Sequence, residues 1–335
     1  MNRPAGHPLI PPAKVGVLIV NLGTPDAAEA GAVRRYLAEF LSDPRVIEIP
    51  RLIWKPILHG AILRTRPRKS AHAYSLVWRE DGSPLAAITR QQSDALRAKF
   101  GDAVMVEYAM RYGRPAIADT LTAMKAAGCE RILIAPLYPQ YCAATTATAN
   151  DAAFAALAAM RWQPAIRTLP PYYDDPAYIA ALKASVEASL AALPFEPDAI
   201  LASFHGMPAR TLALGDPYHC HCQKTARLLA EALGRDLIVS FQSRFGRAKW
   251  LEPATDAMLA GLPAKGVTRV AVVAPGFSAD CLETLEELAI RGRETFLKVG
   301  GADFAYLPCL NAGQGSIEML QLLLRRELAG WVGAS

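Results

Sequence analysis

Residues 266–277 read GVTRVAVVAPGF, an apolar run of strand length that breaks at a proline. Residues 128–138, GCERILIAPLY, repeat the same pattern. Each run follows a helical stretch, and before each helix stands a similar motif, RYGR at residues 111–114 and RFGR at residues 244–247. An apolar run of this length bounded by turn residues is typical of a fully buried strand. The chain therefore carries two copies of one βαβ half-unit.

Each copy also has a first strand of its own. Residues 15–21 form an apolar run that ends at the turn sequence GTPD, and residues 199–204 end in the same way at HGMP. Strands that alternate with helices predict a parallel sheet covered by helices on both faces. We therefore expect an α/β fold of two Rossmann-like lobes. Because ligands bind outside the carboxyl ends of parallel strands, an active-site cleft is expected between the lobes.

The repeat also predicts the domain boundaries. We expect a disordered tail over residues 1–14, which are rich in proline and lack the apolar segment of a secretory signal. The first lobe is expected at residues 15–163 and the second at residues 164–335. The last helix, residues 316–331, follows the last repeated unit, so we expect it to cross back and pack on the first lobe.

The composition limits the class of protein. With 335 residues, 52% of them hydrophobic, the chain is long enough for two cores of ordinary size. The net charge of +5 comes without the dense Lys/Arg stripe of nucleic-acid-binding proteins, so we expect no nucleic-acid partner. No run approaches the ~20 apolar residues that span a bilayer. Six cysteines without a secretory signal indicate reduced thiols or metal ligands in a cytoplasmic protein.

His205 is the sharpest catalytic candidate. It stands where a buried strand ends, and Gly206 and Pro208 force the backbone to turn, which directs a side chain into the cleft. An imidazole takes or gives protons near neutral pH because its ordinary pKa is about 6.5. The alternative, of equal weight on the sequence alone, is a strand-end histidine that is satisfied by the backbone.

Acidic residues gather after the second proline-ended strand. Asp280 and Glu283 have the spacing of a helix capping box, and Glu286 and Glu287 can simply favour the helix dipole. Spacing alone favours this structural interpretation. However, four acids within eight residues exceed what one helix start requires. Glu283 and Glu287 would repel each other by roughly 0.2–0.5 kcal/mol on one helix face, a cost that a bound cation removes.

Three further patterns have both a structural and a functional interpretation. The pairs Arg111-Tyr112 and Arg244-Phe245 can hold a flat anionic ligand or form structural salt bridges. Residues 49–69 mix apolar and basic side chains, as an interfacial amphipathic segment or a core-facing helix does. In extended backbone, alternate cysteines face the same side, so a metal cluster would join one such pair to distant thiols. The cysteines concerned are Cys220 and Cys222, with Cys142, Cys129 or Cys309 as distant partners.

Together the motifs resemble the ferrochelatase family, whose members insert Fe2+ into protoporphyrin IX. They are NLGTP (21–25), YPQY (138–141), SFHGMP (203–208), GDPY (215–218), QSRFG (242–246), and PGF (275–277) leading to ETLEE (283–287). The resemblance extends from about residue 15 to the last helix. It implies the two-lobed chelatase fold, with the porphyrin in the cleft.

The resemblance also implies roles for individual residues. His205 and Glu283 would face each other across the macrocycle, for iron binding and for removal of the pyrrole protons, with the division of labour open. Glu286 and Glu287 would continue an acidic path beyond Glu283. The porphyrin-binding residues would be Leu22, Arg111, Tyr112, Tyr138 and Trp250. Some members hold a [2Fe-2S] cluster, for which the candidate ligands are Cys142, Cys220, Cys222 and Cys309.

Protoporphyrin IX and Fe2+ are thus the expected substrates of a lyase in haem biosynthesis. Residues 49–69 would form a mobile lip that contacts the inner face of the cell membrane peripherally, and a homodimer is a further expectation. A sister chelatase acting on coproporphyrin III or a cobalt precorrin is an alternative, as is a non-catalytic two-lobed haem- or metal-binding protein. A sugar- or amino-acid-binding protein would need a secretory signal, which residues 1–14 lack.

Overall fold

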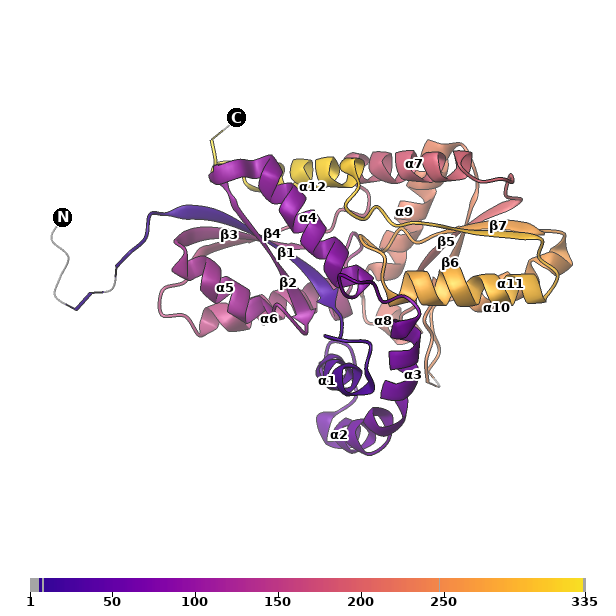
Figure 1. Ribbon diagram of the computed structural model, residues 1–335, viewed down its shortest axis with the longest axis horizontal. Helices are drawn as coiled ribbons and strands as arrows, with labels where there is room; N and C mark the ends of the chain where they lie inside the picture. Colours follow the sequence, from indigo (N-terminus) through magenta and orange to yellow (C-terminus); the bar gives the residue numbers. More distant parts are fainter. Residues whose placement is uncertain (1–5, 8, 247, 334–335) are drawn as a thin grey trace.

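The computed structural model describes residues 6–7, 9–246 and 248–333, and it consists of two lobes side by side (Figure 1). The sheet of the first lobe has the strand order β2-β1-β3-β4, and every neighbouring pair is parallel. Its strands are β1 (Lys14–Gly23), β2 (Met105–Tyr112), β3 (Cys129–Pro136) and β4 (Ala165–Thr168).

The second lobe repeats this arrangement. Its parallel sheet has the order β6-β5-β7-β8, which is the order of the first sheet with each strand replaced by its copy. The strands are β5 (Ala199–His205), β6 (Leu237–Gln242), β7 (Arg269–Val273) and β8 (Asp303–Leu307). The predicted fold class is therefore confirmed.

Helices cover both faces of each sheet because the strands alternate their buried side chains between two sides. In the first lobe, Leu18 and Val20 pack against α5 and α6, whereas Val17 and Ile19 pack against helices of the opposite face. The covering helices are α4 (Pro84–Phe100), α5 (Ile117–Ala126), α6 (Thr148–Ala158), α7 (Pro176–Ala191), α9 (Tyr218–Leu233), α10 (Thr255–Gly261), α11 (Arg293–Lys298) and α12 (Gln314–Glu327).

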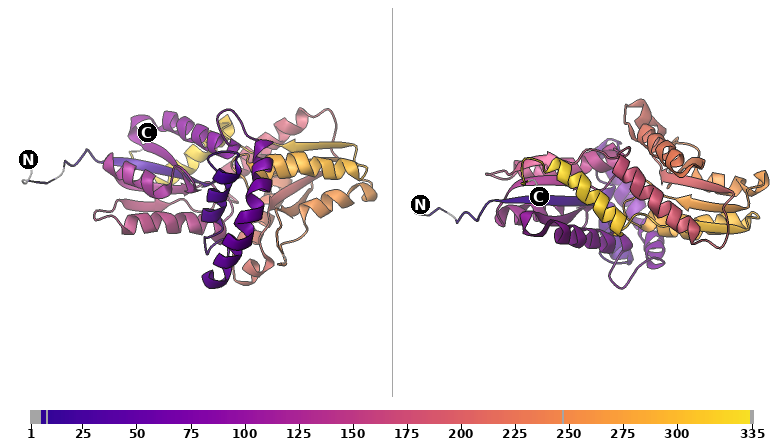
Figure 2. Two further views of the ribbon diagram at one scale, coloured as in Figure 1. Left: turned by 60° about the horizontal axis from the view of Figure 1, so that its bottom comes forward. Right: turned by 90° about the horizontal axis from the view of Figure 1, so that it is seen from above.

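Helix α12 returns from the second lobe to the core of the first. Its side chains Leu320, Leu323 and Leu324 are buried in one cluster with Val17 and Leu133 of the first sheet. Figure 2 shows α12 lying over the first lobe, side by side with α7. The first core is therefore completed by residues near the other end of the chain.

The division between the two sheets falls later than the sequence predicts. Strand β4, which a boundary at residues 163 and 164 assigns to the second lobe, pairs with β3 in the first sheet through residues 165–168. Parallel pairing needs a crossover, and α6 supplies it before β4. The connection to the second sheet therefore begins only after Thr168.

A helical arm lies below the junction of the lobes. It consists of α1 (Ala30–Phe40), α2 (Arg51–Ile57), the π-helix η1 (Leu58–Ile62) and α3 (Leu63–Ser75) (Figure 1). Residues 49–69 carry both buried and exposed apolar side chains. Leu58 and Leu63 are buried against Leu41, whereas Leu52 is 90% exposed and Ile53 59% exposed. None of the described helices has the length and apolar character needed to cross a bilayer.

Part of the predicted tail contacts the first lobe. Residues 1–5 and 8 lie outside the described residues, so the prediction of disorder is untested there. Strand β1 begins at Lys14, and Pro11 and Pro12 lie so close to Gly128 that a Cβ at Gly128 would meet the Pro12 carbonyl at 2.4 Å. The end of the expected tail is therefore packed rather than free.

Candidate functional site

His205 is the last residue of β5, at the carboxyl edge of the second sheet. The turn that follows is tight, because a Cβ on Gly206 would lie 2.5 Å from the carbonyl oxygen of Gln242 and 3.2 Å from the ring of Trp250. The His205 ring is half-buried, and its Nδ1 lies 2.7 Å from the Gly206 carbonyl oxygen. Among the described residues, none is hydrogen-bonded to its Nε2. The ring is thus fixed at one nitrogen and available at the other.

Glu283 begins the π-helix η5 (Glu283–Gly292). Its backbone carbonyl accepts a hydrogen bond of 2.7 Å from Nε2 of Gln242. Gln242 is also the register partner of His205 across β5 and β6. One side chain therefore ties the strand end that carries the histidine to the helix start that carries the carboxylate.

The predicted capping box does not form. Asp280 is buried and accepts hydrogen bonds from Tyr306 at 2.6 Å and Asn311 at 2.7 Å, in addition to Thr284 at 3.0 Å. The Glu283 carboxylate instead has the buried thiol of Cys281 as its hydrogen-bond partner. The interpretation of Glu283 as part of a helix cap is therefore not supported. In addition, π-helical turns are frequent at functional sites.

The first lobe contacts the residue just before Glu283. Leu282 packs with Val33, Ala71 and Tyr74 of helices α1 and α3. Burial raises the pKa values of the Tyr36 and Tyr74 phenols, and the nearby negative charge of Glu283 raises them further. These two tyrosines therefore lie near Glu283, although no motif in the sequence indicates them.

Arg111 and Tyr112 are used inside the first lobe. Arg111 forms an ion pair with the buried Asp43, and its Nε donates to Thr148 at 2.7 Å. The Tyr112 hydroxyl donates to Asp43 at 2.9 Å, and the Tyr112 side chain is fully buried. Burial opposes ionisation of Asp43, but hydrogen bonds from Thr148, the Arg45 backbone and Tyr112 outweigh it and lower the pKa of this carboxyl. The structural interpretation of this pair is therefore the one observed.

Of the other predicted porphyrin-binding residues, Trp250 and Tyr138 lie outside the named strands and helices, and Leu22 lies near a strand end. Trp250 packs on Gly206, beside His205, and donates from Nε1 to the Phe245 carbonyl at 3.0 Å. Tyr138 follows β3, and its buried hydroxyl has no hydrogen-bond partner among the described residues. Leu22 is half-buried near the end of β1. The structure thus brings Trp250 close to His205.

Sequence comparisons show the family of the chain. A family model described as Ferrochelatase matches residues 14–328. The ferrochelatase of Rhizobium meliloti (strain 1021) is 55% identical over 339 residues, covering 99% of this chain and 100% of that protein. The chain belongs to the ferrochelatase family. The predicted enzyme class is confirmed, since a ferrochelatase inserts iron into a porphyrin. The ferrochelatase of Azoarcus sp. (strain BH72) is 53% identical and covers 96% of this chain.

Solved structures of other chelatases share the ferrochelatase fold seen here. SirB from Bacillus subtilis with Fe3+ superposes with a TM-score of 0.58 at 14% identity, covering 95% of this chain and 97% of SirB. CbiX, the terminal enzyme for biosynthesis of siroheme in denitrifying bacteria, superposes with a TM-score of 0.51 at 14% identity. This superposition covers 94% of this chain and 100% of CbiX. At this level of identity the likeness shows the fold alone.

The other two acids of the ferrochelatase motif ETLEE are already paired. Glu286 is buried and accepts from Nε of Arg291 at 3.0 Å. Glu287 accepts from the backbone N–H of Ser243 at 2.7 Å and from its hydroxyl at 2.6 Å. Ser243 has a φ of 63°, so Glu287 holds a strained turn in place. The acidic path beyond Glu283 stays a prediction, and both of its members have structural partners.

The cysteines do not fit a [2Fe-2S] cluster. Cys220 and Cys222 lie in helix α9, where positions two apart point to nearly opposite sides, so the extended backbone assumed from the sequence is wrong. Cys220 is exposed, whereas Cys222 and Cys142 are buried. Cys309 lies beside Tyr306 and Asp280 at another place in the fold. Within residues 6–7, 9–246 and 248–333, no three His, Cys, Asp or Glu side chains are grouped to hold a metal.

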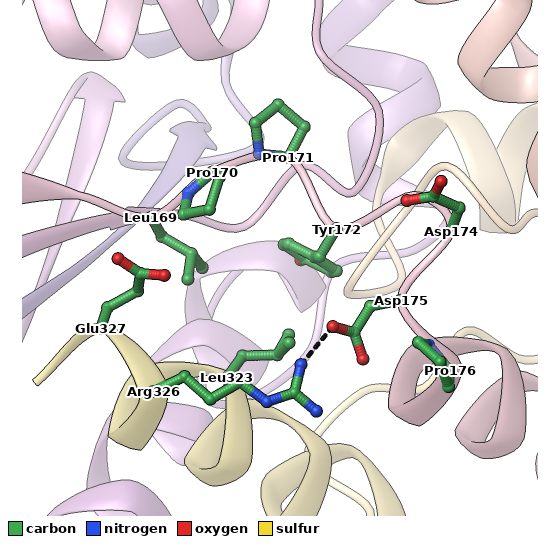
Figure 3. Close-up of a pocket in the computed structure, with 10 residues that line it drawn as sticks. All are labelled: Leu169, Pro170, Pro171, Tyr172, Asp174, Asp175, Pro176, Leu323, Arg326 and Glu327. Carbon is green, nitrogen blue, oxygen red and sulfur yellow. Dashed lines mark hydrogen bonds and ion pairs between the residues drawn. The ribbon is translucent and has the colours of Figure 1, made fainter. Parts of the chain in front are cut away.

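A surface pocket of ≈ 280 Å³ lies elsewhere, where α12 meets the segment before α7 (Figure 3). Its charged walls include Arg326 and Asp175, which form an ion pair. None of the predicted site residues lines it. The contacts of Gln242 with His205 and Glu283, rather than this pocket, therefore indicate the position of the catalytic candidates.

Proposed function

We propose that this chain inserts Fe2+ into protoporphyrin IX at the junction of the lobes, with His205 and Glu283 at the reacting centre. A single observation supports placing these two residues at one centre. Gln242 pairs with His205 in the sheet, and its side chain donates a hydrogen bond to the backbone carbonyl of Glu283. Glu283 also lies close enough to Tyr36 and Tyr74 of the first lobe to affect their pKa values. A porphyrin between the lobes would thus meet both groups.

Neither group forms an ion pair with a described residue, which suits the chemistry. Insertion of Fe2+ releases two N–H protons from the ring, and a positioned base contributes about 10²–10⁴ to the rate of such a step. Imidazole and carboxylate can each accept a proton. They can also bind Fe2+ without the thiolate ligands that would hold it too tightly for transfer to the ring nitrogens. Which of the two groups accepts the protons stays open in this proposal.

The remaining predicted residues divide into contacts and supports. Trp250, Leu22 and Tyr138 stay in the proposed porphyrin-binding set. Tyr112 is fully buried in the Asp43 cluster and Arg111 is 18% exposed, so they enter the proposal as supports of the first lobe's strand ends rather than as contacts.

An anaerobic assay tests the proposal. Protein, Fe2+ and protoporphyrin IX are mixed without oxygen, and metalloporphyrin absorbance is followed together with proton release. Two protons per metalloporphyrin are expected. Parallel reactions with coproporphyrin III identify a sister chelatase if that porphyrin turns over faster. Porphyrin binding without protons or product would contradict the proposal and favour a non-catalytic binding protein.

The exposed part of the arm supports a peripheral membrane contact. Leu52 and Ile53 are exposed beside the basic residues Arg51 and Lys55, a combination that favours anionic lipid surfaces. Sedimentation with vesicles of anionic lipid should pull down the wild type but less of the double variant Leu52→Ser, Ile53→Ser. Equal pull-down would contradict this contact. The predicted homodimer stays a prediction that analytical ultracentrifugation can check.

A [2Fe-2S] cluster is left out of the proposed function because its four candidate ligands do not converge on one point. Cys142 and Cys222 share a buried cluster, whereas Cys220 is exposed and Cys309 lies in a different cluster. The visible absorption spectrum of anaerobically purified protein checks this. Charge-transfer bands of a bound cluster, in stoichiometric amount, would contradict it.

A further inference from the structure

Helix α9 of the second lobe holds the segment that follows β3 of the first lobe. The Thr225 hydroxyl accepts from Nε2 of Gln140 at 3.0 Å, and Asp216, just before the helix, accepts from the Ala143 backbone at 2.8 Å. Between them, Nδ1 of His221 accepts from the Tyr141 backbone N–H at 3.2 Å. Two side chains of α9 and one just before it thus fix residues 140–143 across the lobe junction.

His221 is the most constrained of the three. Its ring lies on the ring of Tyr173, with centroids 3.6 Å apart and planes 9° from parallel. Tyr173 belongs to the segment between the two sheets, and its carbonyl accepts from the Thr225 hydroxyl at 2.7 Å. The imidazole therefore joins α9, the inter-sheet segment and residue 141. It can accept the Tyr141 N–H only while Nδ1 carries no proton.

The held segment leads to predicted site residues in both directions. Tyr138, with its buried and unpartnered hydroxyl, stands three residues before Tyr141. After Tyr141 come the π-helix η3 (Ala143–Ala147) and Thr148, which hydrogen-bonds to Arg111. A shift of Tyr141 would therefore be passed to the wall of the site on either side.

From these contacts we infer that His221 is a positioning residue for iron insertion, which fixes the Tyr138–Tyr141 segment through a neutral Nδ1 acceptor. The inference rests on the function proposed above. His221 touches no reacting atom in this scheme. Its effect passes through the backbone of Tyr141 to Tyr138.

The charges around His221 determine how it responds to pH. Burial lowers the pKa of His221, while Asp174 before α7 and Asp216 before α9 act in the opposite direction. Its aromatic neighbours are Tyr173, which stacks on its ring, and Tyr141, from whose backbone N–H it accepts a hydrogen bond. Because the folded pKa is below the unfolded one, the tie is complete above about pH 6.5 and is lost progressively as the pH falls below that value.

Two variants separate the acceptor from the bulk of the ring. The Oδ1 of an asparagine can take the place of Nδ1, so His221→Asn keeps the acceptor, whereas His221→Ala removes it. The exposed Gln223→Ala on the same helix is the matched control. We expect His221→Ala to lower kcat/KM for the porphyrin by about tenfold, since small misplacements of positioning groups are costly. His221→Asn should stay within about threefold of wild type.

The pH profile adds a readout that a merely structural residue would not change. Between pH 5 and 8, the acidic limb of kcat/KM should be flatter in His221→Asn than in the wild type, because an amide does not titrate. Equal activity of His221→Ala and wild type would overturn the inference, as would equal losses in both variants. Melting temperatures of all variants at pH 5.5 and 7.5 report the tie without turnover. If wild-type protein fails to make metalloporphyrin, the proposed function fails, while an unchanged pH dependence of melting in His221→Asn would separately overturn the tie.

Discussion

The two lobes share one topology but treat their equivalent polar residues differently. In the first lobe, Arg111 pairs with the buried Asp43, whose side chain is 5% exposed. In the second lobe, the corresponding Arg244 pairs with Asp256, whose side chain is 71% exposed. The same motif therefore serves as a buried structural cluster in one copy and as a surface ion pair in the other.

The ends of the first strands differ in the same way. Asn21, near the end of β1, is buried and donates to the Thr89 hydroxyl at 3.1 Å. His205, at the end of β5, has one ring nitrogen that no described residue contacts through a hydrogen bond. A duplicated framework can thus be completed internally in one lobe and left chemically open in the other. The open copy is the one in which we place the reaction.

The largest expected effect is on His205. Replacing His205 with Ala should lower kcat for metal insertion by about 10²–10⁴, because a positioned base is lost. Porphyrin binding, followed by fluorescence quenching, and the melting temperature should stay close to wild type. Turnover within tenfold of wild type would remove His205 from the mechanism and erase this difference between the lobes.

The second effect contrasts the two arginine pairs. Asp43→Ala leaves Arg111 largely buried without its partner, which should destabilise the fold by about 3–5 kcal/mol. Asp256→Ala removes an exposed pair and should cost less than about 1 kcal/mol. Urea unfolding monitored by circular dichroism measures both. Similar losses in the two variants would mean that the lobes use their arginines alike.

A smaller loss is expected at the end of β1. Asn21→Ala removes the hydrogen bond to Thr89 and should destabilise the fold by about 1–3 kcal/mol. The same urea titration applies, with His205→Ala as the control that should show little change. A stable Asn21 variant beside an unstable His205 variant would reverse the assignment of structural and reactive strand ends.

The smallest effect concerns the start of the second sheet. Hydrogen bonds from Arg269, with the backbone N–H groups of Arg269 and Thr268, lower the pKa of Asp198 to about 2. The carboxylate therefore stabilises the folded state above about pH 4, and this contribution disappears as the pH falls from 4 towards 2. Asp198→Asn should flatten the acid limb of the stability curve. A curve parallel to wild type down to pH 2 would contradict the lowered pKa.

Much of the fold could be predicted from the sequence because the repeated units contain apolar runs of strand length. The ends of β5 and β7, which carry or precede His205 and Glu283, follow from that periodicity. The positions of Tyr36 and Tyr74 could not be predicted from the sequence. They depend on the packing of α1 and α3 against Leu282, which is a contact between segments far apart in the chain. The pairing of β4 was missed because its four residues carry little pattern.

Local backbone state limited the rest. In a strand, the spacing of Cys220 and Cys222 would place both thiols on one face, where they could bind the same metal. In a helix it places them on different sides, and only the structure shows that this segment is a helix. Likewise, Asp280 and Glu283 have the spacing of a capping box, but the carboxylate of Asp280 is taken up by Tyr306 and Asn311. The spacing of two residues does not show whether residues from elsewhere in the chain form hydrogen bonds with one of them.

The return of α12 to the first lobe has a consequence for the nascent chain. Leu320, Leu323 and Leu324 fill the core around Val17 and Leu133, so that core stays open until α12 has left the ribosome. Domains usually complete their folding in order of synthesis. Here the lobe made first should be the lobe finished last, with its exposed apolar face a natural target for chaperones during translation.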